Sequence, residues 1–313
     1  MKILVGVDGS PCSVTAIDLV ASLPWPSGSH VTLLAAYEVP IDWTGGVAST
    51  MNWIGDVEDA TRDALVEQLS TLATRLEERG LAVDRIVARG RAASAIVDAA
   101  RERQVDLVVT GSRGRGPLRQ MLLGSVASEV ASEAPCPVLV ARRPAVSRLV
   151  VATDGSSIAR AIPDRLAGWG IFAGLPAEVV AVSIPDGPVF ETAVSLYTLG
   201  DERLASHRRH LREQYEQDAE EMATALGAIG IPSVPHLRAG DPAHEILAVT
   251  EERDADLVVT GTRGLGGIDR LLLGSVARNV LTHARCSVLI LRETVDARPL
   301  EAAASGGTSH ASQ

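Results

Sequence analysis

Short apolar runs alternate with longer amphipathic stretches along the whole chain. Runs such as residues 107–109 are apolar throughout, which is typical of strands buried on both faces of a parallel sheet. Between the runs, apolar residues recur at helical spacing, as at Leu65, Leu69, Leu72 and Leu76. The alternation predicts α/β architecture with right-handed crossovers in a doubly wound parallel sheet, with helices on both faces.

The order of elements occurs twice. In the first half we expect strands at 2–8, 30–38, 83–88, 105–110 and 137–142, and helices at about 11–23, 56–80, 92–103 and 125–134. In the second half we expect strands at 148–153, 178–184, 233–238, 256–260 and 287–292, and helices at about 157–169, 203–227, 242–253 and 275–284. An offset of about 150 residues suits two α/β domains and is too long for a solenoid. We predict domains at 1–143 and 147–293, and a disordered tail at 294–313.

Composition and charge narrow the class of protein. The chain is 46% hydrophobic but only 3% aromatic, so its cores are built from Val, Leu, Ile and Ala. Its net charge of −10, without a run of Lys or Arg, argues against nucleic acid or an anionic membrane as a partner. No apolar run approaches the ~20 residues that cross a bilayer, and we expect a cytoplasmic protein. Cys136 and Cys286 precede apolar strands at equivalent positions, which indicates core packing, and a redox role for Cys12 is the less favoured interpretation.

One glycine pattern closes the fourth strand of both halves. Residues 106–130 and 256–280 each contain Gly-x-x-Gly, nine further residues, and then Gly-Ser. The first glycines let backbone N–H groups approach an anion, and Gly-Ser opens a helix whose first N–H groups are free and whose dipole end is positive. This arrangement indicates a phosphate site in each half.

With this doubled spacing, and with Asp-Gly after the first strand of each half (Asp8, Asp154), the chain resembles tandem universal stress proteins of the ATP-binding subgroup over residues 1 to about 293. The resemblance implies two five-stranded sheets of order 3-2-1-4-5, related by a pseudo-twofold axis. It also implies that the final strands pair with each other, which covers two apolar edges that would otherwise invite aggregation. Strands one and four then flank the point where the winding reverses, which is where ligands bind. Motif and topology therefore select the same crevice.

The resemblance implies one ATP per domain, with Mg²⁺ held by the phosphates. We assign phosphate contacts to Gly111, Ser112, Arg113, Gly114, Gly124, Ser125 and Val126, and to Gly261, Thr262, Arg263, Gly264, Gly274, Ser275 and Val276. The Ser125 hydroxyl either caps its helix or bonds a phosphate oxygen. Asp8 and Asp154 are expected to bond the ribose or the adenine edge, the alternative being a carboxylate that only favours the helix dipole. By resemblance, adenine lies against Ala36, Gly90, Ala181 and Gly240.

The two predicted sites differ in charge. Within the nine-residue spacer, Arg115 and Arg119 of the first half correspond to Leu265 and Asp269 of the second. The first site is more basic and is hypothesised to bind triphosphate more tightly, although an ordinary solvated charge difference is the alternative. The histidines form no metal pattern, so no protein metal site is assigned.

Three functions remain at this stage. The favoured interpretation is an ATP-binding regulator of stress response or growth that acts on an unknown protein partner. The second is a slow ATPase or adenylyl-transferring enzyme, against which there is no Gly-x-x-x-x-Gly-Lys-Ser/Thr loop and no base near the γ-phosphate, so no catalytic residue is assigned. The third is a scaffold without nucleotide. Association of two chains into a homodimer is left open.

Overall fold

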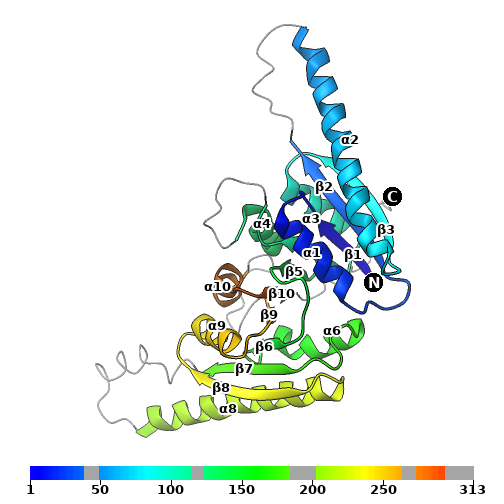
Figure 1. Cartoon of the computed structure of the whole chain (residues 1–313). Helices are drawn as coiled ribbons and strands as arrows, with labels where there is room; N and C mark the ends of the chain where they lie inside the picture. The colour runs from blue at the N-terminus through cyan, green and yellow to red at the C-terminus, as the bar shows by residue number, and fades with distance from the viewer. Residues whose placement is uncertain (39–48, 115–122, 184–201, 263–272, 293–313) are drawn as a thin grey trace, which may run out of the picture.

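The computed structural model describes residues 1–38, 49–114, 123–183, 202–262 and 273–292 (Figure 1). Its strands are β1 (Lys2–Gly6), β2 (His30–Tyr37), β3 (Ala82–Arg89), β4 (Leu107–Gly111), β5 (Val138–Ala141), β6 (Leu149–Thr153), β7 (Ala177–Ser183), β8 (Ser233–Ala239), β9 (Leu257–Gly261) and β10 (Ser287–Leu291). Its helices are α1 (Pro11–Ser22), α2 (Ser49–Glu77), α3 (Ala92–Arg103), α4 (Ser125–Glu133), α5 (Ser157–Arg160), α6 (Ile162–Trp169), α8 (Glu202–Ala228), α9 (Pro242–Glu252) and α10 (Ser275–His283). The expected tail at 294–313 lies outside the described residues.

All ten strands form one sheet, in the order β3-β2-β1-β4-β5-β10-β9-β6-β7-β8. Each half therefore has the predicted order 3-2-1-4-5, which is confirmed. Neighbouring strands are parallel except β5 and β10, which pair antiparallel with Leu139 opposite Leu289. The two predicted five-stranded sheets thus merge at their final strands, and neither of these apolar strands is left as an edge.

Helices cover both faces of this sheet because its strands are apolar on both sides. Ile3 and Val5 face the core cluster that contains residues of α1, α2, α6 and α8, whereas Leu4 between them faces the cluster that contains residues of α3, α4, α9 and α10. The long helices α2 and α8 lie at opposite ends of the molecule (Figure 1). This layering places the carboxyl ends of β1 and β4 next to the starts of α1 and α4. It places those of β6 and β9 next to the starts of α5 and α10.

Two arginines cross the β5–β10 junction in a reciprocal manner. Arg142 follows β5 and donates from Nη2 to the Leu281 carbonyl of α10 at 2.6 Å, and from Nη1 to the Cys286 carbonyl at 3.4 Å. Arg292 follows β10 and donates from Nη2 to the Ala131 carbonyl of α4. Each domain therefore holds the last turn of the other domain's final helix, where a positive charge is also favoured by the helix dipole.

Two predicted helices have different bounds. α2 begins at Ser49 instead of residue 56. The helix expected at 157–169 is broken at Ala161, because Pro163 sits in the first turn of α6, where its ring lacks an N–H and cannot continue a helix from α5. Among the described residues, no helix is long and apolar enough to cross a membrane.

Candidate functional site

The loop after β4 packs directly on the start of α1. A Cβ atom built on Gly111 would lie 2.6 Å from the backbone carbonyl carbon and oxygen of Cys12, so this approach requires glycine. Ser10 joins the two segments: its hydroxyl accepts the Ser13 N–H at 3.2 Å as the N-cap of α1, and donates to the Arg113 carbonyl at 3.2 Å. The first glycine loop is thereby fixed against the strand-one turn.

The Asp8 carboxylate lies against the second glycine of this loop. Its Oδ1 accepts the Ser10 N–H at 2.9 Å, and a Cβ atom on Gly114 would lie 2.6 Å from its Oδ2. The structure therefore brings Asp8 and the glycine loop together, as the sequence predicted. Ser112, which is buried, donates its N–H to the Ala141 carbonyl at 3.1 Å and anchors the loop to β5.

Helix α4 begins beside this loop without a side-chain cap. Gly124 is its N-cap residue and donates its N–H to the Ser112 carbonyl at 2.7 Å. Ser125 is therefore the first helical residue and is exposed, so of the two roles foreseen for its hydroxyl, capping α4 is excluded. The N–H groups of the first turn, which include those of Ser125 and Val126, have no acceptor within the helix and are available to an anion.

The second domain repeats this construction. Thr262 donates its N–H to the Leu291 carbonyl at 2.9 Å, and Gly274, the N-cap of α10, donates to the Thr262 carbonyl at 2.7 Å. Asp154 accepts the Ser156 N–H at 3.0 Å, as Asp8 does with Ser10. Described site residues here are Asp154, Gly261, Thr262, Gly274, Ser275 and Val276, whereas Arg263, Gly264, Leu265 and Asp269 lie outside the described residues. Arg115 and Arg119 of the first spacer also lie outside them.

Beside the ends of β2 and β3 lie three interacting polar side chains, Tyr37, Glu58 and Arg89, which the sequence analysis did not single out. Gly90 donates its N–H to the Tyr37 carbonyl at 2.8 Å, next to Ala36. The Tyr37 hydroxyl donates to Glu58 of α2 at 2.9 Å, and Arg89 lies 3.4 Å from the same Glu58 oxygen. The hydrogen bond to Glu58 raises the pKa of Tyr37. The sequence signal for this polar cluster is a tyrosine, Tyr37, at the last position of a largely buried strand.

The strand register changes one of the adenine assignments. Val5 and Val151 are equivalent and pair with Leu33 and Val179, so the counterpart of Ala36 is Val182. Ala181 corresponds instead to Ala35 and is fully buried in the core. Gly240 follows β8 as Gly90 follows β3, as expected.

The universal stress protein family matches residues 1–142 and again residues 146–292. The chain belongs to the universal stress protein family. A universal stress protein of Mycolicibacterium smegmatis is 26% identical over 303 residues, which cover 93% of this chain and 96% of that protein. The Bacillus subtilis universal stress protein YxiE is 31% identical over 145 residues, or 45% of this chain and 98% of that protein. The predicted family and tandem organisation are confirmed.

Solved structures agree with the fold of this universal stress protein. The crystal structure of a universal stress protein from Archaeoglobus fulgidus superposes with a TM-score of 0.61 at 20% identity, and the match covers 93% of this chain and 96% of that one. The likeness supports the doubly wound arrangement over both domains.

The cysteines of this universal stress protein should differ sharply in reactivity. Burial raises the pKa of Cys136 to about 12 and that of Cys286 to about 11, so at pH 8 both are neutral thiols and poor nucleophiles. Cys12 is partly exposed. We expect iodoacetamide at pH 8 to modify Cys12 alone in the native protein and all three after unfolding in urea, as read by peptide mass spectrometry. Modification of Cys136 or Cys286 at the rate of Cys12 in the native protein would contradict their packing.

Proposed function

We propose that this universal stress protein binds one adenine nucleotide in each domain, ATP with its Mg²⁺ being the ligand expected from the motif, and that occupancy regulates a protein partner. The observation that carries the proposal is the contact of Asp8 with Gly114 beside the uncapped start of α4. A carboxylate, a glycine loop and free helical N–H groups converge there from three separate elements.

The residues present fit a polyphosphate chain. Gly111 and Gly114 let the loop lie directly against the start of α1 and against Asp8, because a Cβ atom on either glycine would lie 2.6 Å from Cys12 or Asp8. The first turns of α4 and α10 offer N–H donors at the positive ends of their dipoles. Gly111 to Gly114 and Gly124 to Val126 would hold the phosphates of the first site, with Asp8 directed at the sugar or base. No cluster of metal-ligating side chains occurs among the described residues, so Mg²⁺ would enter with the phosphates.

Binding at this site supplies enough free energy to regulate a partner. A ligand present at 100 times its dissociation constant stabilises the bound form by about 2.7 kcal/mol, and two sites can contribute twice that. The position of the site favours such a role, because both final helices carry phosphate donors at their first turn and an arginine from the other domain at their last.

The small molecules bound to freshly purified protein test the proposal. We expect denatured protein to release close to two adenine nucleotides per chain, ATP among them, as identified by chromatography and mass spectrometry. ADP in place of ATP would support slow hydrolysis. Release of none, together with no calorimetric binding of added ATP and Mg²⁺, would reject nucleotide binding and favour a scaffold.

A further inference from the structure

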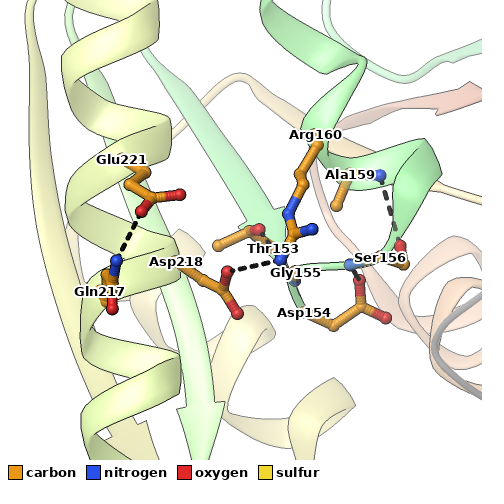
Figure 2. Close-up of polar contacts among 9 residues, drawn as sticks. All are labelled: Thr153, Asp154, Gly155, Ser156, Ala159, Arg160, Gln217, Asp218 and Glu221. Atoms are coloured by element: carbon orange, nitrogen blue, oxygen red, sulfur yellow. Dashed lines mark hydrogen bonds and ion pairs between the residues drawn. The ribbon is translucent and has the colours of Figure 1, made fainter.

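Helix α8 brings a carboxylate onto the turn that follows β6. Figure 2 shows Asp218 pointing toward Gly155, the residue after Asp154. A Cβ atom on Gly155 would lie 2.1 Å from Oδ2 of Asp218, and Gly155 has a φ of +70°, so only glycine permits this contact without strain. The Asp218 side chain is 18% exposed. The strand-end turn of the second site is thus held next to a second, largely covered carboxylate.

Arg160, the last residue of α5, is the cation paired with this carboxylate. Its Nη2 lies 3.4 Å from Oδ1 of Asp218, and its side chain is 67% exposed. In Figure 2 the guanidinium is directed at Asp218, while the carboxylate of Asp154 lies on the other side of the turn. A solvated ion pair of this kind is weak, so Arg160 neutralises the negative charge of Asp218 only in part. While it is paired, Arg160 is directed at Asp218 and not at a ligand.

The first domain has different residues at these positions. The buried faces of α2 and α8 align at an offset of 150 residues, with Leu69 matching Ala219 and Leu76 matching Leu226. Gln68 therefore takes the place of Asp218. Leu65 takes the place of Tyr215, and the aligned strand-one turns put Val14 in the place of Arg160.

Tyr215 indicates that the two carboxylates of the second site act on one region. Its side chain lies one turn before Asp218 on α8 and is partly buried. The pKa of Tyr215 is raised mainly by burial, and the negative charges of Asp154 and Asp218 raise it further. Asp154, the carboxylate expected to meet the nucleotide, and Asp218 therefore both lie near enough to Tyr215 for their charges to act on it, although they lie on opposite sides of the Gly155 turn.

The sequences of the two glycine loops also make the first site more basic than the second. Between Gly111 and Gly124 the sequence contains three arginines and no acid, whereas between Gly261 and Gly274 it contains two arginines and one aspartate. Resting on the proposed function, we infer that Asp218, packed on Gly155 and paired with Arg160, makes the second site selective for adenosine monophosphates relative to the first site, which prefers the triphosphate.

The selectivity follows from ligand charge. A monophosphate carries about two negative charges near neutral pH and a triphosphate about two more, so the field of a nearby carboxylate penalises ATP more than AMP. Removing the Asp218 charge relieves this repulsion and releases Arg160 toward the phosphates. Removing Arg160 leaves Asp218 unscreened. The two substitutions therefore have opposite expected signs.

The test uses the full chain with one site disabled at a time. Ser125→Glu places a carboxylate at the first turn of α4 and leaves the second site, and Ser275→Glu does the converse. In the Ser125→Glu background we expect Asp218→Asn to raise ATP affinity about fivefold, with AMP affinity changed less than about twofold, and Arg160→Val to lower ATP affinity, as measured by isothermal titration calorimetry. Glu221→Gln removes the same charge from an exposed position one turn further along α8 and should change neither affinity.

The outcomes separate this inference from the function on which it rests. A ratio of ATP to AMP affinity that is lower in the Ser125→Glu protein than in the Ser275→Glu protein, and that rises with Asp218→Asn, supports the inference. Equal ratios in the two parents, or shifts of the same sign for Asp218→Asn and Arg160→Val, overturn it while nucleotide binding stands. If wild-type protein binds neither ATP nor AMP, the proposed function fails and the inference fails with it.

Discussion

Replacing Ser125 and Ser275 together by glutamate should weaken ATP binding by more than about a hundredfold without lowering the melting temperature. Both residues are exposed at the first position of their helices, where the N–H groups are free. A carboxylate there is favoured by the helix dipole, so the fold is kept or slightly stabilised. The same charge would occupy the proposed phosphate position and repel the ligand.

Calorimetric titration with ATP and a thermal melt measure the two halves of this prediction. Ser128→Glu is the matched control, since Ser128 is exposed one turn further along α4 and its N–H is bonded to the Gly124 carbonyl. It should leave ATP affinity within about threefold of wild type. Undiminished ATP binding by the double variant would show that the nucleotide does not use the starts of α4 and α10.

Replacing Arg142 and Arg292 together by alanine should lower the free energy of unfolding by about 3 to 6 kcal/mol. Each guanidinium donates a charged hydrogen bond to a carbonyl in the other domain, and each such bond contributes about 1.5 to 3 kcal/mol. Because the two contacts lie at opposite ends of the β5–β10 junction, their losses should be nearly additive.

Urea unfolding followed by circular dichroism gives the value, and a second transition would report separate unfolding of the domains. The matched control is Arg143→Ala, because the side chain of Arg143 is exposed and, among the described residues, only its backbone N–H is bonded, to the Ser287 hydroxyl at 3.1 Å. That variant should stay within about 0.5 kcal/mol of wild type. A double variant that loses less than 1 kcal/mol would mean that strand pairing alone holds the junction.

The fold was predictable because its signals are local and occur twice. Apolar runs such as 107–109, the Asp at the end of strand one and the spacing of the glycines each mark one element, and parallel topology then brings Asp8 to Gly114. The break before α6 was missed, because one continuous helix was predicted at 157–169, although Pro163 inside that range is a local signal for it. Such features depend on neighbouring residues in the chain, which the sequence displays directly.

The parts that were missed depend on packing between distant elements. The one-residue shift from Ala181 to Val182 could not be seen, because an aliphatic strand end has no polar residue to fix the register. Asp218 is one of many charged residues on the polar helix α8, and only its contact with Gly155 distinguishes it. Arg142 contacts Leu281 across 139 positions, and no local pattern reports such a bond.

The pairing of β5 with β10 inside one chain also has an evolutionary consequence. When two identical subunits associate through this strand, a single codon change alters both ligand sites at once, and neither can specialise alone. Fusion of the two copies removes that restriction. Gln68 and Asp218 stand at corresponding positions of one chain and already differ, so under the proposed function the two sites of the chain can respond to two different nucleotides.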